Sequence, residues 1–417
     1  MINNSNRIMA AFLFFLAGNL FNTGTAPAFH AGGVGSCDSC HSMHNAKDGS
    51  GMAGSLLLAS DPSSVCLNCH AGAGGTTSAS VFSPDGSALT PGGDFYWLTK
   101  TFTWGGGSSS GDSHGHNIIA QDFNLWEDLR LSQAPGGTYQ SYALGCTSCH
   151  DPHGASQGGT LKGAGAISVS GSYGELPAAG TIRGNYRLLG NSDYGSGKKA
   201  TAFQFAYDAP IARQNFSNRF GESDSSHVDY GSGMSEWCGN CHNGILQSEH
   251  KAGGAGFEHP VGDSAMLSGE TVSNYNLYIK TGELSGDASS AYLQFVPFER
   301  GISDPQMLDP TSRQGPNTNS RVMCLTCHRA HASAFSSIGR WDLDASLLAE
   351  SHPAAGDAGV SGNDVLYSYY GRNIAAEFGS GQGPFCEKCH IITPETMGNP
   401  DMQPSTGGGS LLPDPFF

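Results

Sequence analysis

The stretch CDSCHSMHNA, from Cys37 to Ala46, decides how this chain folds. It holds a Cys-x-x-Cys-His unit and then a further histidine, His44, three residues after His41. The unit occurs six times, and each of the twelve cysteines belongs to one of these motifs. Numbered 1 to 6 along the chain, the motifs contain the cysteine pairs Cys37/Cys40, Cys66/Cys69, Cys146/Cys149, Cys238/Cys241, Cys324/Cys327 and Cys386/Cys389.

The histidine that closes each motif has a defined role in this pattern. In Cys-x-x-Cys-His, the two thiols bond to the two vinyl groups of one haem, and the next histidine becomes the proximal axial ligand of the iron. These proximal histidines are His41, His70, His150, His242, His328 and His390. The spacing therefore predicts six covalently bound haem c groups.

Three other uses of paired cysteines fit the sequence less well. A zinc site combines two nearby ligand pairs and needs no histidine after each pair. A redox dithiol needs one reactive pair. Disulfides in an exported chain would not repeat one pentapeptide six times with no cysteine to spare. Haem attachment accounts for all twelve cysteines at once.

Both ends of the chain lack haem motifs. Residues 1–28 contain Arg7, an apolar run too short to span a membrane, and the sequence APA at Ala26–Ala28, which together are typical of an export signal. We expect cleavage after Ala28, which leaves Phe29 as the first mature residue, and no lipid anchor because no cysteine lies there.

Residues 391–417, with five prolines, predict an extended or disordered tail, although its apolar end LLPDPFF could dock on a neighbouring surface. The hexahaem domain is expected over residues 29–390, in a secreted protein exported through the periplasm.

The composition limits both partners and fold class. The formal net charge is -16, which excludes nucleic acid as a partner because phosphate binding needs a basic surface. Glycine accounts for 60 of 417 residues, but 10% aromatic residues argue against general disorder. The uneven spacing of the motifs excludes tandem repeats of one fold. We expect mostly irregular chain with short helices and few strands, packed as one unit around a continuous chain of six haems.

Local patterns predict where regular structure forms. Short helices are expected at the haem motifs themselves. Apolar residues recur at intervals of three and four over Thr271–Lys280, Asp342–Glu350 and Asp364–Phe378, which predicts three further helices. The sequence GGGSSSG, Gly105–Gly111, predicts an exposed loop.

In motifs 1, 3 and 5 a second histidine follows the proximal one by three residues. These histidines are His44, His153 and His331. Residues three apart on a helical turn share a face. The second histidine of each pair therefore cannot reach the face of the iron opposite the proximal histidine of its own motif. Each is therefore expected to bind the iron of another haem, which would hold two haems close enough for rapid electron transfer.

Ten histidines lie outside the motifs, and six are needed as distal ligands. His30 would be second in the mature chain, and His116 and His259 lie beside turn-forming residues that can present a ring inward. His352, in HPAAG, is the main competitor for these positions. His114, His227 and His250 have serine-rich or charged neighbours and are expected at the surface. Methionine could also serve as a distal ligand, which would raise the reduction potential.

Longer stretches from the cleavage site to motif 6 carry a family resemblance. They are AFHAGGVGSCDSCHSMHN, TPGGDFYWLTKTFTW, GHNIIAQDFN, APGGTY, CTSCHDPHG, YGSGMSEWCGNCH, AYLQFVPFERG, CLTCHRAHAS and YYGR. Together they resemble the OmcS family of extracellular hexahaem cytochromes, whose subunits polymerise into conductive filaments. The tail beyond His390 is longer than the family pattern, and some loops differ in length, which bears on subunit packing rather than on haem ligation.

The resemblance implies a ligand set and partners. It assigns the distal positions to His30, His44, His116, His153, His259 and His331. It also implies a homopolymer in which His44 binds a haem of the adjacent subunit. Other redox cytochromes and extracellular electron acceptors are the further partners that it implies.

Six haems with histidine on both faces would carry electrons and bind no substrate, so we expect an electron-transfer protein and not an enzyme. One alternative is a multihaem reductase with one open haem, which often has lysine in place of a motif histidine; all six motifs here keep histidine. A second alternative, a monomeric periplasmic electron shuttle, differs only in assembly, which composition does not reveal.

Overall fold

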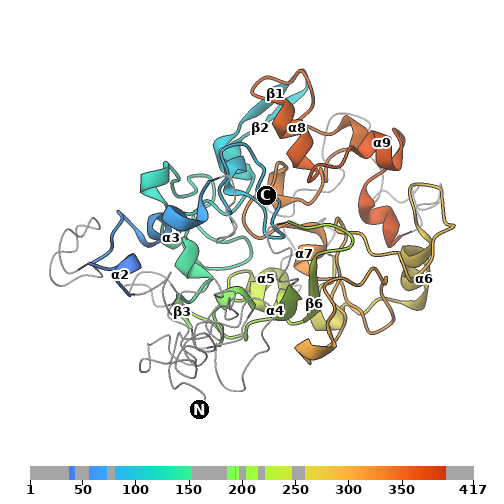
Figure 1. The fold of residues 1–417 in the computed structure, drawn as a ribbon, viewed down its shortest axis with the longest axis horizontal. Coiled ribbons are helices and arrows are strands. Elements are labelled where there is room, and N and C mark those ends of the chain that lie inside the picture. Colours follow the sequence, from blue (N-terminus) through green and yellow to red (C-terminus); the bar gives the residue numbers. More distant parts are fainter. Residues whose placement is uncertain are drawn as a thin grey trace, which may run out of the picture.

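Short helices and two-stranded sheets, joined by long irregular segments, make up the protein in its computed structural model (Figure 1). The structure describes residues 37–42, 56–72, 80–152, 186–192, 194–196, 203–214, 221–246 and 259–390. The helices are α2 (Cys37–Cys40), α3 (Pro62–His70), α4 (Met234–Cys238), α5 (Asn243–Leu246), α6 (Gly269–Leu277), α7 (Cys324–Cys327), α8 (Gly362–Ser368) and α9 (Ile374–Phe378). The short helices and few strands confirm the predicted, mostly irregular fold class.

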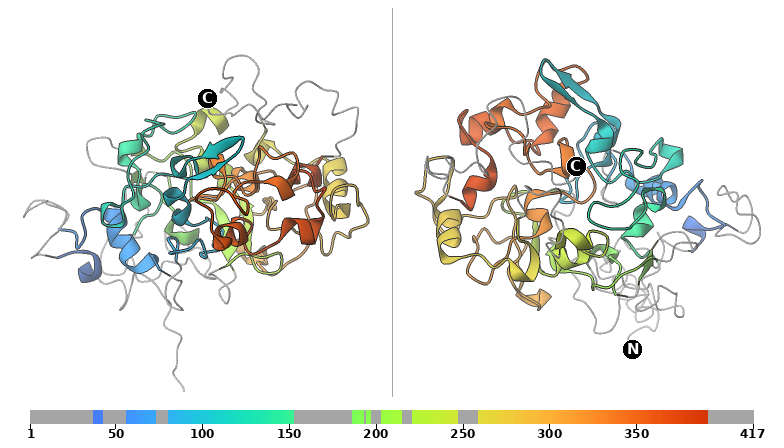
Figure 2. Two further views of the ribbon diagram at one scale, coloured as in Figure 1. Left: turned by 90° about the horizontal axis from the view of Figure 1, so that it is seen from above. Right: turned by 180° about the vertical axis from the view of Figure 1, so that it is seen from behind.

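The strands of the described ranges form three antiparallel pairs. They are β1 (Phe102–Trp104) with β2 (Gly107–Ser109), β3 (Gly195–Ser196) with β4 (Phe203–Gln204), and β5 (Ile211–Gln214) with β6 (Val228–Ser232). In both views of Figure 2, as in Figure 1, α2 and α3 lie at one end of the molecule and α6 lies at the other. Within the described ranges, each helix falls short of the length and apolar character that a membrane span needs.

The haem motifs coincide with short helical turns, as predicted. Motifs 1, 2 and 5 lie on α2, α3 and α7, and motifs 3 and 6 lie on 3₁₀ turns at Cys146–Ser148 and Phe385–Lys388. Motif 4 begins at the last residue of α4, Cys238, and continues as a turn. Helix α3 begins where the Asp61 carboxylate accepts a hydrogen bond from the Ser64 amide at 2.8 Å, with Pro62 in the first turn. This cap determines the residue at which the helix of motif 2 begins.

Of the three other predicted helices, one is present as a single helix. Helix α6 matches the prediction over Thr271–Lys280 but is shifted towards the N-terminus. The pattern over Asp364–Phe378 forms α8 and α9 instead of one helix, because Tyr370 at φ 55° and Gly371 at φ 78° turn the backbone left-handed between them.

The predicted helix over Asp342–Glu350 was wrong. Only Leu348–Glu350 forms a 3₁₀ turn. The Asp342 carboxylate accepts a hydrogen bond from the Asp344 amide at 3.0 Å, a local turn that competes with helix formation. The Leu348 amide donates to the carbonyl of Gln382 at 2.9 Å, so this backbone is bound to a distant segment.

The segment Gly105–Gly111 is mostly exposed, as predicted, but it is not a loop throughout. Residues Gly105 and Gly106 form the exposed turn between β1 and β2. Strand β2 then occupies Gly107–Ser109, and Gly111 is buried at the start of a 3₁₀ turn.

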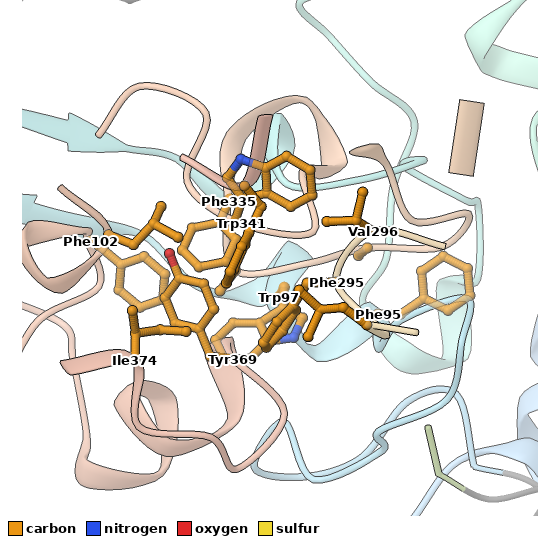
Figure 3. Packing of buried hydrophobic residues seen from close by; sticks show 14 of the residues in the cluster. Phe95, Trp97, Phe102, Phe295, Val296, Phe335, Trp341, Tyr369 and Ile374 are labelled. Atoms are coloured by element: carbon orange, nitrogen blue, oxygen red, sulfur yellow. The ribbon is translucent and has the colours of Figure 1, made fainter. Parts of the chain in front are cut away.

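The largest buried cluster joins Leu67 and residues within 95–125 to residues within 275–385 (Figure 3). The ring of Phe295 stacks on Phe385 at 5.2 Å between centroids, and Trp341 meets Phe385 edge-on at 5.7 Å. A fully buried Phe side chain contributes about 1.5–3 kcal/mol to folding. Because Phe385 directly precedes Cys386, this aromatic cluster fixes the position of motif 6.

Candidate haem-binding sites

The cysteine side chains are available for covalent attachment. The eleven that the structure describes, from Cys40 to Cys389, form no disulfide. Among the described residues, no three His, Cys, Asp or Glu side chains gather as a bare metal ion requires.

Two of the predicted attachment cysteines, Cys69 and Cys386, are exposed, whereas the other nine described ones are partly buried. In motif 2 the reason is the helix itself, because α3 buries Ser64 and Leu67 and turns Cys69 outward, on the same side as the exposed Pro62 seven residues earlier. The bond of Cys69 to haem stays a prediction from the motif.

Three predicted distal histidines lie beside three proximal ones. The ring centroids of His116 and His242 are 6.1 Å apart. Those of His150 and His331 are 6.4 Å apart, and those of His259 and His390 are 6.0 Å apart. Two imidazoles on opposite faces of one metal have centroids about 6 Å apart, the sum of two metal–nitrogen bonds of about 2 Å and two distances of about 1 Å from nitrogen to ring centre. The pairs at motifs 3, 4 and 6 therefore fit an iron between two histidines.

Backbone carbonyls orient these rings for coordination. In five of the predicted ligands, Nδ1 lies 2.8 Å from a carbonyl oxygen: His116, His150, His242, His259 and His328. Because a carbonyl only accepts, Nδ1 carries the hydrogen and the lone pair remains on Nε2. Histidines that bind metals usually donate their other N–H in this way.

Burial favours the neutral form that a metal requires. It lowers the pKa of His242 to about 4 and that of His331 to about 3, so both rings are neutral at physiological pH. Deprotonated imidazole nitrogen is the form that coordinates metal.

One backbone segment, His328–Ala332, connects three sites. It contains the proximal histidine of motif 5, and its His331 lies opposite His150 of motif 3. Its Ala330 carbonyl accepts from His116, the partner of His242 in motif 4. The His116 amide also donates to the His331 carbonyl at 2.9 Å. Motifs 3, 4 and 5 are therefore tied together through a few residues.

The His331 ring is held by a close approach of the backbone. A Cβ atom at Gly92 would lie 2.9 Å from Nδ1 of His331, so any side chain there would displace the ring. The His331 amide donates to the Gly92 carbonyl at 2.7 Å, and its ring stacks on Phe95 at 4.9 Å. The expectation that His331 binds the iron of another motif stays a prediction, for which its place beside His150 of motif 3 is suitable. The geometric reason differs, because α7 ends at Cys327 and the chain is extended at His328.

Two histidines expected at the surface are buried, which corrects that prediction. Both ring nitrogens of His114 are in use, with Trp97 O at 2.9 Å and Ser109 Oγ at 2.6 Å. His227 contacts two backbone carbonyls, those of Val228 and Ser312, both at 2.9 Å. Neither ring has a nitrogen left for iron. No sequence signal marks these residues, since their partners are mostly backbone atoms.

The competitor His352 has partners of its own. Its Nδ1 lies 2.6 Å from Oδ2 of Asp357, and its ring stacks on Trp104 at 4.0 Å and 7°. This stacking fixes His352 beside the β1–β2 hairpin, and no described proximal histidine stacks or pairs with its ring.

A buried charge cluster fits the carboxylates of a haem. Glu222 Oε2 lies 2.7 Å from Nη1 of Arg329 and 3.0 Å from Nη1 of Arg340, with all three side chains almost fully buried. Burial alone would raise the pKa of Glu222, but Arg340 and Arg329 outweigh it and hold that pKa below its usual value. One carboxylate faces two cations, and the Nη2 atoms of both arginines are buried without a hydrogen-bond partner. Such buried donors favour a second anion, and the propionate groups of a haem supply carboxylates.

The remaining predicted ligands are described in part. His41 and His70 lie at the ends of α2 and α3. The predicted distal ligands His30, His44 and His153 lie outside the described residues, as do the predicted export signal, residues 1–28, and the predicted tail, residues 391–417.

Comparison with known proteins places this arrangement in a family. The chain matches none of the known protein-family profiles. It is 39% identical to the C-type cytochrome OmcS of Geobacter sulfurreducens, in a match that covers 89% of this chain and 96% of that protein. Its structure is similar to that of the OmcS nanowires of Geobacter sulfurreducens solved by cryo-electron microscopy, with a TM-score of 0.70 and 36% identity over 87% of this chain and 99% of that chain.

A second solved structure, the outer membrane cytochrome S filament of the same organism, gives a TM-score of 0.69 and 37% identity, again over 87% of this chain and 99% of that one. Both matches extend over most of each chain, as the sequence identity does. The chain therefore belongs to the OmcS family of c-type cytochromes.

Proposed function

We propose that the mature chain, from Phe29, binds six haem c groups and polymerises into an extracellular filament that conducts electrons. The haem irons supply reversible one-electron oxidation and reduction. The observation that carries the proposal is the set of three histidine pairs with centroids 6.0 to 6.4 Å apart, at motifs 3, 4 and 6.

The chain's own residues would attach, orient and enclose the cofactors. The twelve motif cysteines would supply the thioether bonds, and His41, His70, His150, His242, His328 and His390 would supply the proximal ligands. His116, His259 and His331 would occupy the remaining axial positions at motifs 4, 6 and 3. Histidine on both faces would leave no coordination site for a substrate at these three motifs, which supports a carrier of electrons over a reductase. Arg329 and Arg340 would neutralise haem carboxylates inside the protein.

His30, His44 and His153 complete the distal set, on the strength of the family resemblance and the motif spacing. His44 is assigned to a haem of the adjacent subunit. The names of the relatives, which describe nanowires and a filament, support a homopolymer. Other redox cytochromes would deliver electrons, and acceptors outside the cell would receive them.

Intact-mass measurement of the secreted protein tests haem number and processing together. We expect the polypeptide from Phe29 with six covalent haem additions, because six complete motifs are present. Treatment that reduces disulfides should leave the mass unchanged, since thioether bonds are stable to it. A mass with fewer than six additions would contradict the proposal.

A further inference from the structure

Two buried serines have the same position in two haem motifs. Ser63 on α3 lies three residues before Cys66 of motif 2, and Ser235 on α4 lies three residues before Cys238 of motif 4. Residues three apart on a helix share a face. Each serine thus lies beside the first attachment cysteine of its own motif, and both are at most 1% exposed.

Each serine also binds the first cysteine of the following motif. Ser63 Oγ accepts a hydrogen bond from the Cys146 amide at 3.1 Å, and Ser235 Oγ accepts one from the Cys324 amide at 3.1 Å. Each serine therefore binds the backbone of its target cysteine directly.

The helical turns of successive motifs meet at these places. Helix α3 of motif 2 packs against the 3₁₀ turn Cys146–Ser148 of motif 3, and α4, at the start of motif 4, packs against α7 of motif 5. At the first junction the chains approach closely, since a Cβ atom at Gly145 would lie 2.7 Å from Ser63 Oγ. The two junctions thus share one construction, although they lie in different parts of the chain.

The position three residues before the first cysteine differs in the other motifs. It is occupied by Val34, Ala143, Arg321 and Gly383 in motifs 1, 3, 5 and 6. The serine thus occurs only in the even-numbered motifs that are followed by another motif in the same chain. Motif 6, which has no successor in the chain, has glycine.

We propose that Ser63 and Ser235 are positioning residues that fix the separation of consecutive attachment sites and thereby the rate of electron transfer from motif 2 to motif 3 and from motif 4 to motif 5. An electron that crosses such a junction oxidises one site and reduces the next by one electron, with no bond made or broken. This inference rests on the proposed function, since it concerns the path along which the filament would conduct.

The test uses the full-length haem-loaded protein carrying Ser63→Ala, Ser235→Ala or both. Soret circular dichroism reports the coupling of neighbouring haems, and transient absorption after flash photoreduction reports how quickly the electron redistributes among them. Matched controls are Ser64→Ala, which loses buried bonds to Asp61 and Asp122, and Ser268→Ala, which loses the cap of α6. Neither control removes a hydrogen bond to a cysteine of a following motif.

We expect every variant to keep its haem content and to lose a few degrees of thermal stability at most. Ser63→Ala and Ser235→Ala should each weaken the interhaem dichroism signal and slow redistribution severalfold, with the double variant slowest, while the two controls keep wild-type kinetics. Wild-type kinetics in both single variants, or equal slowing in the controls, would overturn the inference. If the wild-type protein itself shows no rapid redistribution, the proposed function fails and not merely the role of the serines.

Discussion

Replacing His331 with alanine is expected to convert the iron at motif 3 from low-spin to high-spin while all six haems remain attached. The ring of His331 lies opposite His150 with 6.4 Å between centroids, so its loss opens one axial position. The cysteines of motif 3 are untouched, which preserves the covalent link. EPR and resonance Raman spectra of the oxidised protein should show about one iron in six as high-spin, in line with the role of axial ligands. Added imidazole should restore the low-spin spectrum by occupying the vacated position.

His227→Ala is the matched control for that variant. His227 is a buried histidine whose two ring nitrogens contact the carbonyls of Val228 and Ser312. Its removal leaves buried acceptors unsatisfied and should cost about 1–3 kcal/mol of stability. It should produce no high-spin iron. A fully low-spin spectrum for His331→Ala would show that this histidine is not an axial ligand.

Replacing His44 with alanine is expected to shorten or abolish filaments. His44 follows His41 by three residues and is assigned to a haem of the adjacent subunit. A metal–ligand bond across the junction would strengthen it and would hold the terminal haems close enough for transfer between subunits. Electron microscopy of the secreted protein should show few or short filaments. Its mass should still include six haems, and one iron should lose low-spin character.

The control for filament formation is His352→Ala. His352 pairs with Asp357 and stacks on Trp104, so its loss should leave the filaments intact. Normal filaments from His44→Ala, with every iron six-coordinate, would mean that His44 binds elsewhere and that surface packing drives assembly.

The haem motifs could be predicted from the sequence because attachment chemistry confines two cysteines and a histidine to five consecutive residues. The exposure of each cysteine could not be predicted, because the exposure of Cys69 depends on which face of α3 packs against the rest of the protein. His116 and His259 stand at no fixed spacing from a haem motif, so the motifs do not reveal them. Turn residues beside them gave the only local signal, and their proximity to His242 and His390 depends on long-range packing.

His114 and His227 were misplaced at the surface for a related reason. The atoms that bury them come from distant backbone, such as Trp97 O and Ser312 O. Serine-rich and charged neighbours in the sequence describe only the local chain. Burial of these two rings therefore depends on segments that no local pattern brings together.

The fold was predictable in class but not in detail. Short caps such as Asp61 with Ser64 act within one turn and are visible in the sequence. The segment from Asp342 to Glu350 has helical periodicity, yet its Leu348 amide binds Gln382, and tertiary contacts outweigh the weak local preference. The charge cluster of Glu222, Arg329 and Arg340 likewise joins residues more than a hundred positions apart, which no local pattern could indicate.

Cryo-electron microscopy of the secreted wild-type protein tests the central claim most directly. The account predicts a filament whose subunits each hold six haems, with irons bound between His116 and His242, between His150 and His331, and between His259 and His390. It also predicts His44 on an iron of the neighbouring subunit. An iron with an open axial face at motif 3, 4 or 6, or secreted protein that remains monomeric, would contradict it.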